Sequence, residues 1–356
     1  MALLWVEGFD TFGTTVGATV SPAGVVGRKY PLIEREADMK IAPGRFSGYS
    51  LQLIDVSTGN IVWMSPGNLT TIDTVVIGFS VYWAGLPSES IYSSSIFMSL
   101  YDGSTRGVYL QFTGVGNVVI GCNTILQTIS TPISLGTWHF IELKVKCHAS
   151  AGTYELRIDG VTVAIATGVN TQAGSNTYHS TFRLSGQETN IVGTPRFDDL
   201  YFLDSSGIRN NDFLGIQKVT TLFPDGTGSA NAWTAFPVAT PAADHYTLVD
   251  EVVCDDNVTY VESLVSAQKE LWAYQDIADA GNISGLQVNV DCRETDANPF
   301  NLITTVKTAS ESDNSASLVG TSSWITKRRI LETDPADSTV WDVAKINSAQ
   351  FGIKVG

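Results

Sequence analysis

Residues 136–164 restrict the folds open to this chain more than any other segment. They read GTWHFIELKVKCHASAGTYELRIDGVTVA, in which apolar and polar side chains alternate on either side of a stretch of small residues. Alternation with a period of two predicts half-buried β-strands. Asp159-Gly160 predicts a tight hairpin turn, because both central residues of a type I′ turn need positive φ. The segment therefore predicts an antiparallel meander with one buried and one solvated face.

The first strand of this meander raises a question of register. Trp138, Phe140, Leu143 and Val145 share one face only if the period slips near Ile141. We expect such a slip, with Trp138 buried in the core. Trp138→Ala would then destabilise the domain by roughly 3–5 kcal/mol, as large-to-small core changes do.

The rest of the sequence favours the same class of structure. At 356 residues the chain is long enough for two domains, and a content of 43% hydrophobic and 16% charged residues argues against a disordered chain. Short β-branched runs alternate with turn residues, and no long helical periodicity interrupts them. The small polar stretch 205–211 marks a boundary. We expect an all-β chain of two β-sandwich (jelly-roll) domains, at 1–207 and 221–356, joined by a linker or crossover at 208–220.

Two motifs of the meander carry a resemblance to a known family. GTWHFIELK and YELRIDGV resemble the centre of a concanavalin A-like, laminin-G-like jelly roll, and the likeness covers residues 5–204. It implies that the first domain is concanavalin A-like and that its last strand, at 197–203, returns beside its first, at 5–12. It implies little about activity, since this fold hosts lectins, glycosidases and structural modules.

The second half of the chain carries another resemblance. An ordered set of short motifs between residues 233 and 353 is similar to the C-terminal module of tailed-bacteriophage virion structural proteins. This resemblance implies a C-terminal β-sandwich of phage structural-protein type and a place in the virion. The motifs are Trp233-Thr234, Val249-Asp250-Glu251, Asp255-Asp256, Thr259-Tyr260-Val261, Tyr274-Gln275-Asp276-Ile277, Asp334-Pro335, 338–341 and 349–353.

Charge and targeting features restrict the partners and locations that we expect for this chain. With 21 basic and 36 acidic residues the net charge is −15, whereas nucleic-acid binding needs clustered Lys and Arg. The one basic cluster, Lys327-Arg328-Arg329, is expected to be a solvated strand edge. No apolar run is long enough to span a membrane, and no signal peptide is recognised at the start. We expect synthesis in the host cytoplasm, a location in the virion, no nucleic-acid partner and no membrane span.

The four cysteines do not form a metal-binding pattern. Cys122, Cys147, Cys254 and Cys292 show no CxxC spacing. Free thiols are favoured by cytoplasmic synthesis, and one or more disulfides are the alternative.

The chain lacks the residue patterns of hydrolases that use such folds. A retaining glycosidase needs two carboxylates roughly 5 Å apart, and the nearest run, at 34–38, reverses the order found in laminarinase-like relatives. No Gly-x-Ser-x-Gly occurs that would place a nucleophilic serine on a strained turn. We therefore expect no enzymatic activity.

Acidic residues near the end of the first domain are the candidate metal ligands. Ca²⁺ takes several converging oxygen ligands, and Asp198, Asp199 and Asp204 could supply some of them. Roles in turns and caps are the favoured alternative for these residues, and we expect no other cofactor.

Aromatic residues near loops are the candidate sugar platforms. Trp83, Tyr92 and Tyr178 each offer a flat apolar ring with a polar tip on which a sugar could stack. A core or interface role for each is the favoured alternative.

The expected function is that of a non-enzymatic structural protein on the exterior of a tailed-phage virion. It would decorate the capsid or associate with the tail, and act through protein–protein interfaces. The alternative is a carbohydrate-binding receptor-recognition protein, such as an adhesin or tail fibre. The expected partners are other virion proteins, a host-surface glycan and further copies of the chain. A trimer is favoured because sandwich edges need cover and symmetric assembly covers them.

Overall fold

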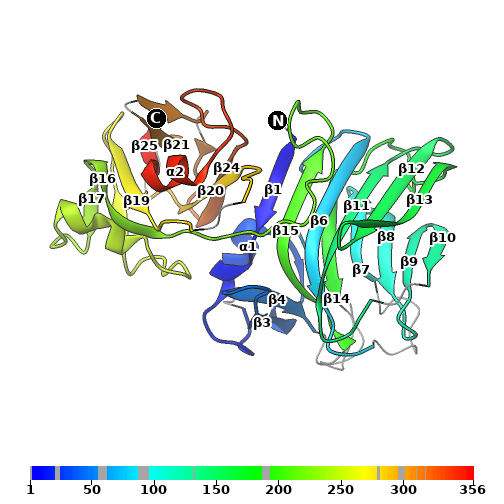
Figure 1. Ribbon diagram of the computed structural model, residues 1–356. Coiled ribbons are helices and arrows are strands. Elements are labelled where there is room, and N and C mark those ends of the chain that lie inside the picture. Colours follow the sequence, from blue (N-terminus) through cyan, green and yellow to red (C-terminus); the bar gives the residue numbers. More distant parts are fainter. Residues whose placement is uncertain are drawn as a thin grey trace. The chain divides into compact units, whose positions relative to one another are not determined.

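The computed structural model describes residues 2–20, 25–54, 62–86, 96–130, 133–186, 193–278, 281–295, 301–309, 311–316 and 318–356. The chain divides into two compact units, Met1–Val219 and Thr220–Gly356 (Figure 1). Both are built from antiparallel sheets, which confirms the expected all-β, sandwich-like class. None of the helices in the described residues has the length and apolar character of a membrane span.

The first unit is a sandwich of two antiparallel sheets, called sheet A and sheet B. Sheet A has eight strands in the order β13-β12-β11-β6-β15-β4-β3, and β1 also pairs with β15. Its strands are β1 (Leu3–Glu7), β3 (Met39–Pro43), β4 (Tyr49–Leu53), β6 (Thr74–Tyr82), β11 (Trp138–Lys146), β12 (Gly152–Ile158), β13 (Val161–Val169) and β15 (Arg196–Asp204).

Sheet B has seven strands in the order β10-β9-β8-β7-β14-β5-β2. Its strands are β2 (Leu32–Glu34), β5 (Val62–Ser65), β7 (Ile96–Asp102), β8 (Thr105–Phe112), β9 (Val118–Cys122), β10 (Thr124–Ile129) and β14 (Thr181–Gly186). The helices of the first unit are short: η1 (Asp10–Phe12), α1 (Val25–Lys29) and η2 (Glu36–Asp38).

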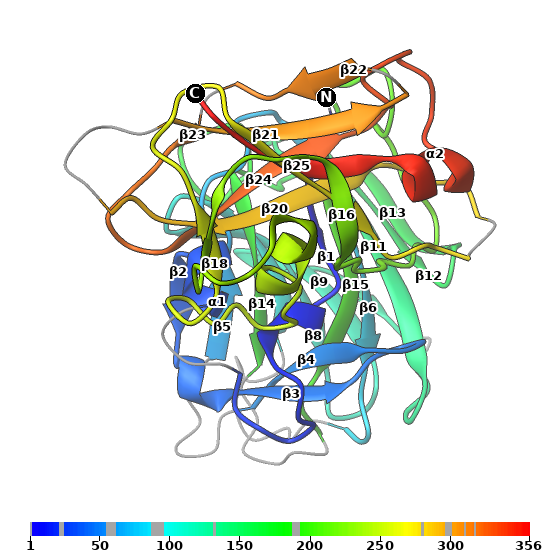
Figure 2. The ribbon, with the colours of Figure 1, turned by 90° about the vertical axis from the view of Figure 1, so that its left-hand side faces the viewer.

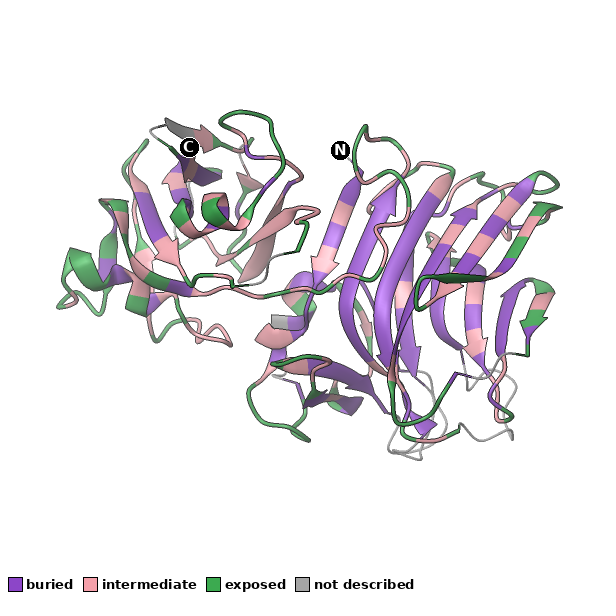
Figure 3. Cartoon of the chain, viewed as in Figure 1, coloured by how far each residue is buried: buried purple, intermediate pink, exposed green. Residues whose placement is uncertain are grey.

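The inner faces of the two sheets meet in an aromatic core. Phe79 of β6 lies edge-on to Phe97 of β7 with ring centroids 6.2 Å apart, and Phe182 of β14 lies 5.2 Å from Phe202 of β15. All four rings are buried, and burying a phenylalanine stabilises a fold by roughly 1.5–3 kcal/mol. In Figure 3 the strands β6 and β15 are coloured as buried along most of their length, so both of their faces are covered.

The return of the last strand beside the first is confirmed. Strand β15 pairs antiparallel with β1, with Leu203 opposite Leu3 and Phe202 opposite Trp5. This pairing gives each of the two strands a neighbour, which leaves less unpaired edge for aggregation.

The predicted turn of the central meander is also confirmed. Asp159 has φ 52° and Gly160 has φ 79°, as a type I′ turn between β12 and β13 requires.

The register of β11 differs from the expectation. The strand pairs with β6 and β12 without interruption, so the expected slip near Ile141 is wrong. A strict period of two turns His139 and Ile141 toward the core and puts Trp138 and Phe140 on the outer face of sheet A. Trp138 is only partly buried, so the expectation that it is a core residue is wrong.

The second unit centres on a six-stranded sheet, β16-β19-β25-β21-β22 with β23 beside β21, and has two further pairs, β17-β18 and β20-β24. Figure 2 shows β21 and β25 side by side, as their register requires. The strands are β16 (Pro224–Asn231), β17 (Thr234–Phe236), β18 (Tyr260–Glu262), β19 (Lys269–Tyr274), β20 (Leu286–Cys292), β21 (Asn301–Thr308), β22 (Glu311–Asn314), β23 (Leu318–Val319), β24 (Ile325–Leu331) and β25 (Gln350–Val355), with helices η4 (Ala242–Leu248) and α2 (Val343–Ser348).

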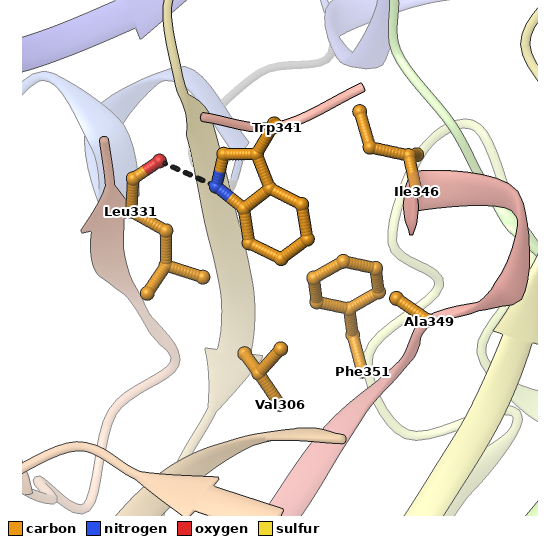
Figure 4. Packing of buried hydrophobic residues seen from close by; sticks show 6 residues of the cluster. All are labelled: Val306, Leu331, Trp341, Ile346, Ala349 and Phe351. Carbon is orange, nitrogen blue, oxygen red and sulfur yellow. Dashed lines mark hydrogen bonds between the residues drawn. The ribbon is translucent and has the colours of Figure 1, made fainter. Parts of the chain in front are cut away.

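One apolar cluster of this unit is built around Trp341 (Figure 4). The indole N–H donates to the carbonyl oxygen of Leu331 at 3.1 Å, and the ring lies 6.4 Å from that of Phe351. Ile346 of α2 packs against the same cluster. The buried indole is thus satisfied by a backbone acceptor, which keeps the cost of burying its N–H low.

Candidate ligand-binding face

The outer face of sheet A carries an aromatic and cationic cluster. The strand register places Trp138 of β11 and Arg196 of β15 on either side of Tyr82, at the end of β6. The Trp138 and Tyr82 rings lie 5.5 Å apart at an angle of 50°, and the Arg196 guanidinium lies 4.8 Å from the Tyr82 ring centroid. All three side chains are partly exposed. We call these three residues the Trp138 cluster.

The Trp138 cluster has the chemistry of a sugar platform. Indole and phenol rings offer apolar faces, and a guanidinium adds a fork of donors for hydroxyl or carboxylate oxygens. Next to it, Gln52 of β4 lies opposite Arg196 and donates to Thr194 Oγ1. Small-molecule sites combine apolar walls with a few polar groups in this way.

Farther along the same face, a β-bulge in β15 organises a buried polar network. The bulge lies between Asp198 and Tyr201, and Asp199 within it has φ 52°. Asp tolerates this left-handed conformation better than most residues. The Asp199 carboxylate accepts a hydrogen bond from Ser80 Oγ at 2.9 Å and pairs with Arg45 Nη1 at 3.2 Å.

The neighbouring carboxyl of Asp198 binds backbone N–H groups. It accepts hydrogen bonds from the Arg45 N–H at 2.7 Å and from the Asp199 N–H at 2.8 Å. Burial, and after it the charge of Asp199, raises the pKa of Asp198 to about 8. Both hydrogen bonds to the Asp198 carboxyl come from backbone N–H groups, as in a structural turn.

The three candidate calcium ligands do not form one site. Asp204 accepts hydrogen bonds from the Ser206 N–H at 2.8 Å and from Thr70 Oγ1 at 3.4 Å, while Asp198 and Asp199 serve the bulge. Among the described residues, no group of three or more His, Cys, Asp or Glu side chains is arranged to hold a metal ion. The structure therefore does not assemble these carboxylates into the calcium site considered from the sequence.

Residues 212–219, called the strap below, continue from β15 and lie on the outer face of sheet A (Figure 1). At the end of the strap, the Val219 N–H donates to Asp199 Oδ1 at 2.8 Å. The sequence suggested a linker at 208–220, whereas this chain belongs to the first compact unit as far as Val219.

The strap covers a buried acid. Glu142 of β11 is fully buried, and its Oε1 accepts hydrogen bonds from the Tyr201 hydroxyl and from the Gly215 N–H at 2.8 Å. The Leu214 N–H donates to the Tyr201 oxygen at 3.3 Å. Burial raises the pKa of Tyr201, so its hydroxyl stays protonated and remains a donor. The strap thus supplies backbone donors to Glu142 Oε1 and to the Tyr201 oxygen, while the Trp138 cluster stays partly exposed.

The aromatic candidates from the sequence fall in three different places. Trp83 is 2% exposed and packs 4.4 Å from Phe112 and 5.0 Å from Phe97, so it has no free face for a sugar and the suggestion is wrong. Tyr92 lies outside the described residues. Tyr178 is half-buried, in the connection between β13 and β14.

Sequence reasoning missed Tyr82 and Arg196 as binding residues. A signal was present in TVVIGFSVY, because the apolar alternation that ends at Phe79 and Val81 puts Tyr82 on the opposite face of the strand. No local signal could place Arg196 beside it, since that contact depends on the pairing of β15 with β6.

Comparisons with known proteins give a fold-level likeness only. No family model and no curated protein matches the chain. An alginate lyase structure is 11% identical with a TM-score of 0.40, covering 56% of this chain and 96% of the lyase. An endo-β-1,4-glucuronan lyase from the fungus Trichoderma reesei is 12% identical with a TM-score of 0.37, covering 49% and 90%. Domain 4 of an extracellular arabinanase from Geobacillus stearothermophilus is 16% identical with a TM-score of 0.35, covering 57% and 93%. Similarities of this size decide neither activity nor ligand.

Proposed function

We propose that the first unit binds a glycan at the Trp138 cluster, and that the protein acts by binding and not by catalysis. The observation that carries this proposal is the position of Trp138. A large indole remains partly exposed on the outer face of a sheet, beside a second ring and a guanidinium. Exposed aromatic and arginine side chains are the usual anchors of binding surfaces.

A glycan array tests this proposal directly. The native protein should retain a set of glycans, and Trp138→Ala and Arg196→Ala should each weaken that binding. Ile165→Ala, at a 64% exposed position of β13 outside the cluster, is the control. Thermal unfolding of each variant confirms that it is folded. If both cluster variants retain every glycan as strongly as the native protein, the proposal fails.

A second proposal concerns the setting of the protein. We propose that it works as a structural component of a tailed-phage virion, on the exterior of the capsid or tail, as a homo-oligomer for which a trimer is favoured. The sequence motifs of the second half motivate it. A feature of the second unit supports a protein–protein interface there: Phe236, Val238 and Val258 are 39%, 77% and 65% exposed around the β17-β18 pair. Grouped exposed apolar side chains mark interaction surfaces.

Static light scattering on the purified protein and cryo-EM of whole particles test this setting. The expected results are a mass of three chains and density for the protein on the particle exterior. A monomer in solution that also stands isolated on the particle, touching no second copy, would contradict the oligomer. Absence of the protein from purified particles would contradict the virion role.

A further inference from the structure

The opposite face of the sandwich, the outer face of sheet B, carries a second row of arginine and aromatic side chains. Arg183 lies on β14, between β5 and β7. Its guanidinium carbon lies 3.6 Å from the ring centroid of Trp63 and 3.9 Å from that of Tyr101. Trp63 pairs with Ser185 and Tyr101 pairs with Thr181, so the two rings flank Arg183 diagonally from both sides.

The row continues onto β8. Arg106 is directly opposite Tyr101 across the strand pair, and its guanidinium carbon lies 4.9 Å from the ring centroid of Tyr109. Tyr109 lies across Gly121 of β9, where a Cβ atom would stand 2.2 Å from the Tyr109 Cζ. The glycine therefore lets the tyrosine ring lie against the sheet. Side chains from β5, β14, β7 and β8 take part, and three strand spacings amount to about 14 Å.

These side chains face outward and not into the core. Their chain neighbours Phe182, Leu184 and Leu100 are fully buried, and side chains alternate between the faces of a strand. Trp63, Arg183, Tyr101 and Tyr109 are partly exposed and Arg106 is exposed.

Neither guanidinium group has a carboxylate as an ion-pair partner in the described part of the chain. The chain has 36 acidic residues, yet among the described residues no carboxylate forms an ion pair with Arg183 or Arg106. The Arg183 Nε is buried without a hydrogen-bond acceptor. Burial lowers the pKa of Arg183, and the neighbouring Tyr101 raises it in part. Arg183 remains charged, because the pKa of an arginine lies far above physiological pH.

In the described part of the chain, two acidic side chains lie at the margins of the row. Glu34 is exposed and pairs with Trp63 on the side away from β14. Asp102, at the end of β7, accepts a hydrogen bond from Asn176 Nδ2 at 3.1 Å. Neither carboxylate is ion-paired with the two arginines, so the centre of the row keeps its positive charge.

We propose that this row, Trp63, Arg183, Tyr101, Arg106 and Tyr109, is a second binding site, which takes an acidic oligosaccharide through its carboxylate groups. A planar guanidinium binds a carboxylate in a bidentate manner, and the partly exposed rings beside the two cations add apolar surface for sugar rings. The ligand is extended and anionic, because the row is flat, spans several strands and contains two cations. The site does not depend on the Trp138 cluster.

Isothermal titration calorimetry of the full chain with an oligogalacturonate tests the proposal. The methyl-esterified oligomer, which has the same rings without the charge, is the ligand control. Loss of a charge-assisted hydrogen bond in Arg183→Ala should weaken binding about 10- to 100-fold. Arg183→Lys keeps the charge but not the planar fork, so it should restore binding only in part. Arg106→Ala, at an exposed position that does not threaten folding, should also weaken it.

Two further variants distinguish binding at this site from binding at the Trp138 cluster and from a general effect of net charge. Arg209→Ala removes the same charge at an exposed position of the 205–211 segment and should leave binding unchanged. The proposal is overturned if the acid oligomer does not bind, if its methyl ester binds equally well, or if Arg183→Ala and Arg106→Ala bind like the native protein. Binding that is lost only in Trp138→Ala would overturn it while supporting the first site.

Discussion

The hydroxyl of Tyr201 joins the strap to sheet A, and its removal by Tyr201→Phe should loosen both. The hydroxyl donates to the buried Glu142 and accepts from the Leu214 N–H. A hydrogen bond contributes about 0.5–1.5 kcal/mol, and leaving a buried partner unsatisfied costs about 1–3 kcal/mol. Phenylalanine fills the same volume, so no large cavity adds to the loss. The first unit should therefore lose about 2–4 kcal/mol of stability.

Urea unfolding followed by tryptophan fluorescence measures this loss. At a slope of about 2 kcal/mol per molar urea, in the middle of the usual range, the midpoint of the first unit should fall by about 1–2 M. Hydrogen exchange should also show faster exchange of the Leu214 and Gly215 amides, because the strap detaches before the unit unfolds. Tyr178→Phe is the matched control, since the described part of the chain offers its hydroxyl no hydrogen-bond partner. A loss below about 0.5 kcal/mol with unchanged amide protection would refute the reasoning.

Four further predictions follow from burial and charge. The pKa of Asp198 is about 8 when folded against 3.8 for an ordinary Asp, so its contribution to stability should fall as pH rises from about 4 to 8, and urea midpoints of Asp198→Asn should lack that fall. Burial lowers the pKa of His179 to about 4 from 6.5; its contribution should be lost as pH drops from 6.5 to 4, and His179→Gln should remove that acid sensitivity from the thermal midpoint. Trp138→Ala should cost less than about 2 kcal/mol, below the 3–5 kcal/mol typical of a core aromatic, and a core-sized loss in urea would contradict the outward placement. Limited proteolysis should cut at 205–211, where Ile208 is 99% exposed, yet the fragments should co-elute on gel filtration because the strap stays bound; immediate separation would argue against that attachment.

Much of the fold follows from local patterns. The turn at Asp159-Gly160 could be predicted because positive φ is a property of those two residues themselves. The strand at 74–82 could be predicted because seven of its nine residues are β-branched or aromatic, the types favoured in strands. The pairing of β15 with β1 followed from the family resemblance of the first half, and the structure confirms it.

The candidate sites could not be predicted in the same way. Trp138 was assigned to the core on the expectation that the period slips near Ile141, whereas its true face depends on the unbroken register with β6. Arg183 lies between Trp63 and Tyr101, which are far from it in sequence. Such contacts arise when strands distant in the chain become neighbours, so the sequence around a residue does not predict them.

The sequence by itself determined the strand pattern, the turns and the all-β class, because these depend on the period of side chains along one strand and on the φ that each residue tolerates. Only the tertiary structure decided which face Trp138 occupies, where the bulge turns Asp199, and that the strap lies over Glu142. The physical reason is that the burial of a residue depends on which other parts of the folded chain cover it. Phe140 lies on an outer face and is nevertheless fully buried, with the Arg45 guanidinium 5.6 Å from its ring centroid.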